Sequence, residues 1–396
     1  MRLLILSFYY PPDLSAGSFR TQALVAALRR ARPDVEIDVF TTMPNRYQAH
    51  AQSVGEMEDI PGVSVTRIPL PVHRSGMADQ SMAFNRFARE VLRLSSGGRW
   101  SLVYTTSSRL MTASLGALVS KRVRAPLYLD IRDLFTDTMR DVLAKSPIRR
   151  VLWPFDFVER WTFRRAKRVN LVSEGFLDHA RRVAPRQTFR TFTNGIDPEF
   201  LTASFAKPDG TQAEPIHILY AGNIGEGQGL HSILPQVAKA MGDRARFTIV
   251  GDGGRRAALA DALAAAGATT VSLLAPVPRA ELFQYYADAD ILFLHLNDLE
   301  AFLKVLPSKI FEYAATGKPV LAGVGGYAAR FITENVPGSA VFPPCDAEGM
   351  LSAINTLLDD RRVPDRDTFR RTYARESIMD LMAQDVLLVA EEVGNK

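Results

Sequence analysis

The sequence has little that would support a disulfide, a structural metal site or a membrane span. Its 396 residues include one cysteine, Cys345, which cannot form an internal disulfide, and six histidines without zinc-ligand spacing. No apolar run approaches the roughly 18 to 20 residues that span a bilayer. The opening apolar stretch is short, and it ends at Pro11-Pro12 without a small-residue cleavage site. We therefore expect a protein without a structural metal that stays in the cytosol.

The composition that is present is typical of a soluble globular protein, with 47% hydrophobic and 23% charged residues. Single cores stop growing at roughly 250 to 300 residues, so the length favours two domains. Charge is divided unevenly, because residues 1–200 carry 30 Lys+Arg against 19 Asp+Glu, whereas the remainder carries 18 against 24. A basic half suits an anionic membrane or a phosphorylated substrate. Nucleic-acid binding has only this charge in its favour, and we expect none.

Apolar runs alternate with helical patterns in two series, which predicts an α/β protein with two Rossmann-like, doubly wound sheets. The runs of the first series lie at 3–8, 35–41, 63–68, 101–105, 126–130 and 168–173, and those of the second at 216–221, 246–250, 270–274, 291–296 and 320–323. A polar, turn-rich linker at 201–215 separates the series. We expect domains at 1–200 and 201–375, then a C-terminal helix at 376–396 that packs back on the first domain. Because ligands lie beyond the carboxyl ends of parallel strands, we also expect an interdomain cleft.

The segment 306–320 carries the clearest chemistry. Pro307-Ser308 would open a helix and Gly317 would close it. The first turn would then present free N–H groups and Lys309 to a phosphate. Glu312, one turn along, can accept hydrogen bonds from a sugar diol. An ordinary capped helix with a surface lysine and glutamate is the alternative that the spacing leaves open.

Five segments in order make the chain similar to a known family. They are Asp130-Ile131-Arg132-Asp133-Leu134, Thr193-Asn194-Gly195-Ile196-Asp197, Val250-Gly251-Asp252-Gly253, 282–290 and 306–320. Over nearly its whole length the chain resembles retaining glycosyltransferases of family 4, which have the GT-B fold, above all bacterial members that build surface polysaccharides. Tyr10-Pro11-Pro12 and Gly17-Ser18-Phe19-Arg20 are similar to the family's first loop, and 302–309 is similar to the phrase before its donor-binding helix.

This resemblance implies transfer of a hexosyl or N-acetylhexosaminyl group from a nucleotide-sugar donor, with a UDP-sugar expected, to a glycan or polyprenyl-diphosphate-linked acceptor in polysaccharide or lipopolysaccharide biosynthesis. It also implies retention of configuration and no metal or other cofactor. The first domain would bind the acceptor and the second the donor, with Glu312 on the ribose hydroxyls and Lys309 on the diphosphate. The catalytic candidates are Asp130, Arg132 and Asp133. The donor-binding candidates are Gly17, Arg20, Gly222, Asn223, Gln228, Gly251, Asp252, Lys304, Ser308, Lys309, Ile310 and Glu312.

The sequence departs from the family pattern in three places along its motifs. Lys304 stands where a second acid is common, Asn223 and Gln228 stand where Arg and Lys are common, and Arg132-Asp133 stands where His-Asp is common. Phosphate binding should therefore depend on Lys309, with Lys304 and Arg255 as further candidates. For Asp130 and Asp133, helix capping after a strand is the alternative to catalysis.

Residues 146–168 hold seven basic residues, two acids and five aromatics. Such a helix can lie on an anionic membrane, which would place the protein at the inner face of the cell membrane. The alternative is a helix that packs Phe157 and Trp161 into the first domain. Other functions remain open: a catalytically inactive GT-B subunit that binds a partner, suggested by Lys304, or a nucleotide-sugar epimerase, whose acidic and histidine motifs are not found. A dehydrogenase is disfavoured, because the Gly-rich loops lack a full GxGxxG with its downstream acid.

Overall fold

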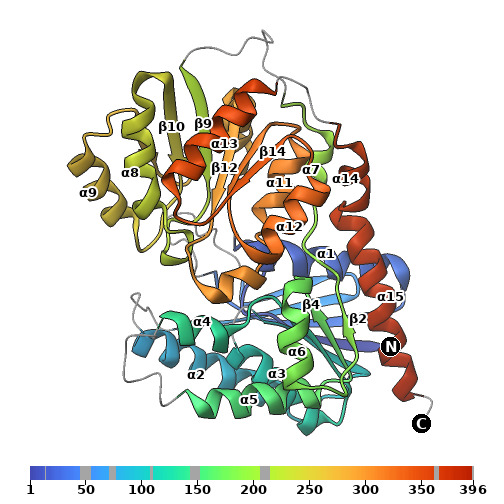
Figure 1. Ribbon diagram of the computed structural model, residues 1–396. Coiled ribbons are helices and arrows are strands. Elements are labelled where there is room, and N and C mark those ends of the chain that lie inside the picture. The colour runs from blue at the N-terminus through green and yellow to red at the C-terminus, as the bar shows by residue number, and fades with distance from the viewer. Residues whose placement is uncertain are drawn as a thin grey trace. The chain divides into compact units, whose positions relative to one another are not determined.

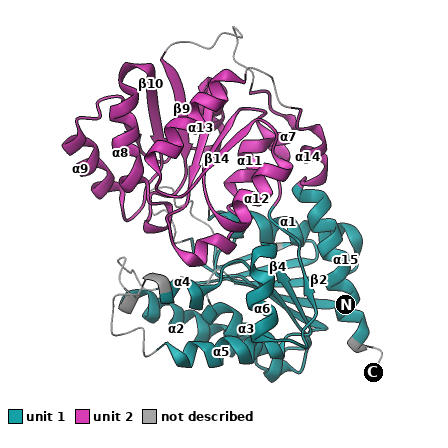
Figure 2. Cartoon of the chain, viewed as in Figure 1, with its two compact units in different colours: residues 1–194, 375–396 teal, residues 195–374 magenta. Residues whose placement is uncertain are grey.

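Residues 1–194 and 375–396 form one unit of the structure, and residues 195–374 form the other (Figure 2). This computed structural model describes residues 1–13, 15–44, 55–70, 77–107, 110–142, 152–205, 215–360 and 365–394. The chain enters the second unit at Asn194-Gly195 and returns to the first at Ala374-Arg375. Residues 206–214, in the segment where we placed the linker, lie outside the described residues.

The sheet of the first unit has the strand order β3-β4-β2-β1-β5-β6-β7-β8. The strands are β1 (Arg2–Leu6), β2 (Glu36–Thr42), β3 (Met57–Ile60), β4 (Val63–Ile68), β5 (Leu102–Ser107), β6 (Leu127–Ile131), β7 (Arg168–Leu171) and β8 (Phe189–Arg190). All neighbours pair in parallel except β3, which runs antiparallel to β4 at the edge. The strand order reverses between β1 and β5. Ligands commonly bind at such a switch point, beyond the carboxyl ends of the two strands.

Helices cover this sheet, and the C-terminal helix belongs to the same unit (Figure 1). They are α1 (Ala16–Ala31), α2 (Met77–Leu94), α3 (Leu110–Val123), α4 (Phe135–Val142), α5 (Trp153–Arg165), α6 (Leu177–Val183) and α15 (Arg375–Gly394). Helix α15 packs along α1. Its Asp385 is nearly buried and accepts hydrogen bonds from Tyr128 at 2.9 Å and Arg168 at 2.5 Å. These contacts fix the C-terminal helix to strands β6 and β7.

The sheet of the second unit is parallel throughout, with the order β11-β10-β9-β12-β13-β14. Its strands are β9 (Ile216–Ala221), β10 (Ala245–Val250), β11 (Val271–Leu274), β12 (Ile291–His295), β13 (Val320–Gly323) and β14 (Ser339–Phe342). The order reverses between β9 and β12. The predicted fold class, two parallel sheets in an α/β chain, is confirmed.

Two apolar clusters pack on opposite faces of the second sheet. One face is covered by α7 (Pro198–Thr202), α10 (Arg279–Asp288), α11 (Lys309–Ala315), α12 (Gly326–Asn335) and α14 (Asp367–Thr372). The other is covered by α8 (Leu230–Met241), α9 (Arg256–Ala266) and α13 (Ala347–Asp359). Burial on both faces explains why these strands read as continuous apolar runs.

Within the described residues, the sequence analysis missed three strands. Strands β3, β8 and β14 each lie at an edge of their sheet and hold four residues or fewer, so their apolar patterns are weak. The C-terminal helix that the sequence predicted at 376–396 falls in α15, and the chain between α14 and α15 is not helical. There Ala374 pairs with Ile196, and the Ile196 N–H donates to the Tyr373 carbonyl at 2.8 Å.

Candidate functional site

Two glycine-rich loops meet at the switch point of the second sheet. The loop after β9, residues 222–229, is hydrogen-bonded to the end of β10 and the loop that follows it: the N–H of Gly222 donates to Val250 O at 2.9 Å, and the N–H of Ile224 donates to Asp252 O at 2.8 Å. A Cβ on Gly251 would lie 1.9 Å from the Gly222 carbonyl oxygen. Only glycine therefore allows these two predicted site residues to approach each other.

The side chains of Asn223 and Gln228 bind each other across the loop. The Asn223 amide donates to Gln228 Oε1 at 2.7 Å, and the Gly225 N–H donates to the same oxygen at 3.2 Å. Behind them, buried His295 accepts from the Cys345 N–H at 2.9 Å through Nε2, so Nδ1 carries the proton and donates to the Gln228 carbonyl at 2.6 Å. Burial lowers the pKa of His295 and keeps it neutral. Asn223 and Gln228 thus shape the loop, and His295 is a supporting residue that the sequence analysis did not find.

Helix α11 begins at Lys309, as expected from the sequence, but Ser308 does not cap it. The Ser308 backbone is helical, with φ −62° and ψ −26°, and its side chain makes no cap hydrogen bond. A capping side chain needs an extended backbone to reach the N–H groups of the first turn. Ile310 differs too, since its side chain is 1% exposed and packs in the apolar core. The predicted donor contact therefore cannot come from the Ile310 side chain.

Lys309 and Glu312 point to the same place on α11. Lys309 Nζ lies 2.7 Å from Glu312 Oε2, and both side chains are partly exposed, at 30% and 18%. Burial opposes the charge on Lys309, but the adjacent Glu312 carboxylate outweighs it and raises the Lys309 pKa above its usual value. The structure brings together the cation and the carboxylate that the sequence singled out.

Buried residues that the sequence analysis did not single out position α11. The Ala221 N–H at the end of β9 donates to the Tyr313 hydroxyl at 3.0 Å, which ties the helix to the switch point. At the other end of the helix, Arg366 donates to Ala314 O at 3.1 Å and to Pro337 O at 2.8 Å. Burial lowers the Arg366 pKa to about 10. Sequence gave no signal for Arg366, because its partners are backbone carbonyls far from it in the chain.

Lys304 ends a short 3-10 helix (Glu300–Lys304) that leads into α11. This turn packs closely on the start of α12, because a Cβ on Gly326 would lie 2.1 Å from the Leu303 carbonyl oxygen. Arg255, the other basic candidate, is paired with Glu226 within the glycine-rich loops. Asp252 is exposed and its carboxylate accepts from the Gly253 N–H at 2.8 Å.

In the first unit, the start of α1 contacts the loop after β6. A Cβ on Gly17 would lie 2.1 Å from Nη1 of Arg132, so the guanidinium lies against the backbone of the first helical turn. Ser15 caps the helix by accepting from the Ser18 N–H at 3.1 Å. Asp133, next to Arg132, is exposed. Three predicted site residues, Gly17, Arg132 and Asp133, therefore lie at the carboxyl edge of this sheet.

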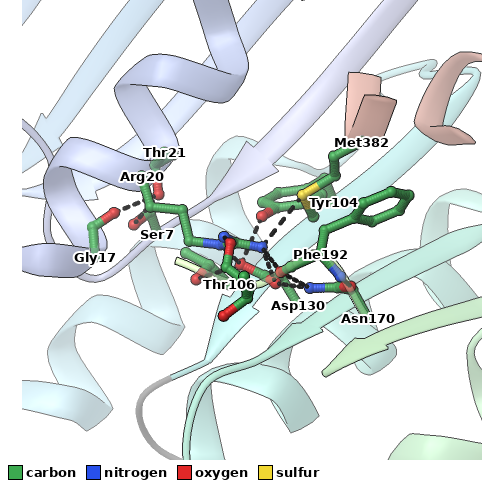
Figure 3. Close-up of polar contacts among 11 residues, drawn as sticks. Ser7, Gly17, Arg20, Thr21, Tyr104, Thr106, Asp130, Asn170, Phe192 and Met382 are labelled. Carbon is green, nitrogen blue, oxygen red and sulfur yellow. Dashed lines mark hydrogen bonds and ion pairs between the residues drawn. The ribbon is translucent and has the colours of Figure 1, made fainter. Parts of the chain in front are cut away.

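Arg20 and Asp130 form a buried ion pair, which corrects both of their predicted roles (Figure 3). Arg20 Nε and Nη2 donate to the two carboxylate oxygens at 2.8 and 3.0 Å, and the guanidinium also binds the carbonyls of Phe192 and Thr193. Asn170 donates to Asp130 at 2.7 Å. Burial opposes the charge on Asp130, but Arg20 outweighs it and lowers the Asp130 pKa. Because both side chains are fully buried, Arg20 does not face a donor, and Asp130 neither faces an acceptor nor caps a helix.

Comparison with known proteins identifies the two parts of the chain. Residues 16–195 match the family described as glycosyl transferase 4-like domain, and residues 215–360 match the family described as glycosyl transferases group 1. By its domains, this chain is a glycosyltransferase. Solved structures share the GT-B fold with this glycosyltransferase along the whole chain. Sucrose-phosphate synthase from Thermosynechococcus elongatus has a TM-score of 0.68 at 17% identity, covering 100% of this chain and 97% of that one.

A second solved structure, Anabaena HepE in complex with UDP and glucose, has a TM-score of 0.64 at 17% identity and covers 100% of this glycosyltransferase and 98% of its own chain. Among curated proteins, the putative colanic acid biosynthesis glycosyl transferase WcaI of Escherichia coli K12 is 28% identical over 163 residues. That match spans 41% of this chain and 39% of the relative, so less than half of the relative's length is matched.

Proposed function

We propose that this glycosyltransferase moves a sugar from a UDP-sugar to a glycan or polyprenyl-diphosphate-linked acceptor, with retention of configuration, in the synthesis of a surface polysaccharide. The observation that carries the proposal is the Lys309 and Glu312 pair beside the switch point of the second sheet. Two findings support the donor and the pathway. HepE was solved with UDP, and the name of the curated relative WcaI refers to polysaccharide synthesis.

The donor would replace the Lys309–Glu312 contact with contacts of its own. The ammonium of Lys309 suits the diphosphate, and the carboxylate of Glu312 suits the two ribose hydroxyls. Negative charge grows on the diphosphate as the bond between the sugar carbon and the phosphate oxygen breaks. The Lys309 cation beside it then stabilises the transition state more than the bound donor, which lowers the barrier. The acceptor hydroxyl forms the new bond to the sugar carbon, and its proton passes to the leaving phosphate oxygen.

We assign the acceptor to the first unit. The Arg132 guanidinium lies against the first turn of α1, and together with the N–H groups of that turn it suits the diphosphate of a lipid-linked acceptor. Exposed Asp133 would accept a hydrogen bond from an acceptor hydroxyl. The excess of basic residues in 1–200 favours an anionic acceptor over a neutral one.

An exposed face of α5 supports contact with an anionic membrane. Trp153 and Phe157 are each 69% exposed, and Arg160 and Arg164 follow at helical spacing and are exposed as well. The alternative that Phe157 packs into the domain does not hold, whereas Trp161 is partly buried. Residues 146–151 of this predicted surface lie outside the described residues. In the described ranges, we find no helix with the length and apolarity to cross a bilayer.

A thermal-shift panel tests the donor assignment, because a ligand that binds only the folded state raises the melting temperature. We expect UDP and a UDP-sugar to raise it more than GDP or ADP. Release of UDP from UDP-glucose or UDP-N-acetylglucosamine by the purified protein separates an enzyme from an inactive GT-B scaffold. A scaffold would bind the nucleotide without releasing it from the sugar. No shift with any nucleoside diphosphate would contradict the proposal.

A further inference from the structure

Tyr286 contacts both residues of the proposed donor site from the protein interior. Its hydroxyl lies 3.2 Å from Lys309 Nζ and 3.4 Å from Glu312 Oε2. The Tyr286 side chain is 0% exposed, whereas Lys309 and Glu312 both reach solvent. The three groups form a triangle in which Tyr286 is the member that a bound donor cannot touch.

The core determines where this hydroxyl lies. Tyr286 sits on α10, and its ring contacts Phe200 on α7 and Tyr313 on α11, with ring centroids 5.7 and 5.8 Å apart. Phe205 lies on it edge-on at 6.1 Å. Because other rings pack against it on several sides, the Tyr286 ring is held in one position. The flexible side chains of Lys309 and Glu312 therefore share a fixed partner.

A group that hydrogen-bonds to both Lys309 and Glu312 must accept from the first and donate to the second. An ammonium only donates and an ionised carboxylate only accepts, whereas a neutral hydroxyl does both. Lys309 donates to the Tyr286 oxygen, and Tyr286 donates to Glu312. Burial, and then the Glu312 charge, raise the pKa of Tyr286 well above its ordinary value, so the hydroxyl keeps its proton.

We propose that Tyr286 is a positioning residue of the donor site, which holds Glu312 in place for the ribose while Lys309 turns to the diphosphate. When the ammonium leaves Glu312, the carboxylate keeps the Tyr286 hydrogen bond on one oxygen. Its remaining acceptor positions are then directed to the ribose diol. Without the hydroxyl, Glu312 would lose the hydrogen bond that remains when Lys309 moves away, and it would keep only the charge of nearby Arg279 among the contacts that the structure describes. The inference rests on the proposed function, since it assigns Tyr286 a role in that same site.

Tyr286→Phe tests the inference, because it removes the hydroxyl and keeps the ring. We measure the affinity for UDP by calorimetry, with Tyr285→Phe, the neighbouring tyrosine on α10, as the matched control. We expect the dissociation constant of Tyr286→Phe to rise about tenfold, as for a lost hydrogen bond to a charged group. Tyr285→Phe should match the wild type. Unchanged UDP affinity in Tyr286→Phe would overturn the inference and leave the proposed function standing.

A double-mutant cycle with Glu312→Gln excludes a purely structural effect. If Tyr286 acts through the Glu312 carboxylate, Tyr286→Phe should change UDP affinity by less than about twofold in the Glu312→Gln background. An undiminished tenfold loss in that background would mean that the hydroxyl only stabilises the fold, and would overturn the inference. Failure of the wild type to bind UDP, GDP or ADP would overturn both the proposed function and this inference.

Discussion

Lys309 and Glu312 lie one turn apart on α11 and are ion-paired, with Lys309 Nζ 2.7 Å from Glu312 Oε2. The ammonium of Lys309 and the carboxylate of Glu312 thus bind each other through the same groups that would bind a nucleoside diphosphate. Partly exposed pairs of this kind stabilise proteins by about 1 kcal/mol or less. Exchanging the pair for contacts with a diphosphate and a ribose therefore costs little. The two residues that we assign to the donor thus neutralise each other's charge in this structure.

Asp130→Asn should destabilise the protein strongly. The amide keeps the shape of the carboxylate but leaves Arg20 charged, buried and without its counter-ion, which costs about 3 to 5 kcal/mol of unfolding free energy. Asp261→Asn is the matched control, since Asp261 on α9 is exposed and its substitution should change stability by about 0.5 kcal/mol or less. Urea denaturation of both variants measures the difference. A fully stable but inactive Asp130→Asn would restore the catalytic role that the structure removes.

His179 makes stability depend on pH. It lies between Asp137 on α4 at 3.3 Å and Glu159 on α5 at 3.2 Å, and Arg140 also contacts Asp137, at 3.5 Å. Burial opposes the charge on His179, but hydrogen bonds to the two carboxylates outweigh it and raise the His179 pKa to about 9. A pKa above the unfolded value of about 6.5 means that this stabilisation is complete below about pH 6.5. It is lost as the pH rises through about 9.

Unfolding free energies measured by urea across this range should fall by up to about 3 kcal/mol in the wild type. His179→Gln cannot titrate, so its free energy should be lower at neutral pH and should vary less with pH. Parallel curves for the two proteins would show that His179 is not charged in the folded state.

Lys304 should act through its charge. It lies five residues before Lys309, at the end of the turn that leads into α11, and an ammonium cannot accept the sugar hydroxyl hydrogen bonds that an acid would accept. We expect Lys304→Met to lower turnover more than it lowers UMP affinity, because a cation beside the β-phosphate matters most as the bond breaks. Steady-state kinetics and calorimetry measure the two quantities. Wild-type activity in both Lys304→Met and Lys304→Glu would place Lys304 outside the site, and activity restored by Glu would assign it to the sugar instead.

The exposed face of α5 should bind anionic vesicles. Replacing Arg160 and Arg164 by Ser should reduce sedimentation with phosphatidylglycerol vesicles and flatten its salt dependence, since this attraction is screened within a Debye length of about 10 Å. Replacing Trp153 and Phe157 by Ser should reduce binding at every salt concentration. Arg246 and Arg371, both exposed in the second unit, provide the control pair. Equal binding by all variants would show that α5 does not contact the membrane.

The sequence predicted the sheets well because strands buried on both faces must be apolar along their length. It also placed Lys309 and Glu312 together, because residues three apart on a helix share a face. Local pattern could not show that Arg20 would pair with Asp130, 110 residues away. The same residue types in a sequence motif can form a buried ion pair or bind a ligand. Only burial, 0% exposed for both side chains, distinguishes them.

The supporting residues were missed for a related reason. Tyr286, His295 and Arg366 act through contacts with segments distant in the chain, and a tyrosine or histidine within an apolar pattern indicates only a core position. Ser308 was misread because capping depends on its backbone angles, which the Pro-Ser motif does not determine. The sequence thus identifies groups that would touch a ligand more readily than groups that hold them.

The affinity of Glu312→Gln for UDP tests the central claim most directly. Calorimetry should show binding weakened by about 1 to 3 kcal/mol relative to the wild type, because a charged acceptor is lost from the ribose. The melting temperature should be nearly unchanged, since the Lys309–Glu312 pair is partly exposed. Glu334→Gln, an exposed acid on α12, should bind UDP as the wild type does. UDP binding by Glu312→Gln with wild-type affinity would contradict the account.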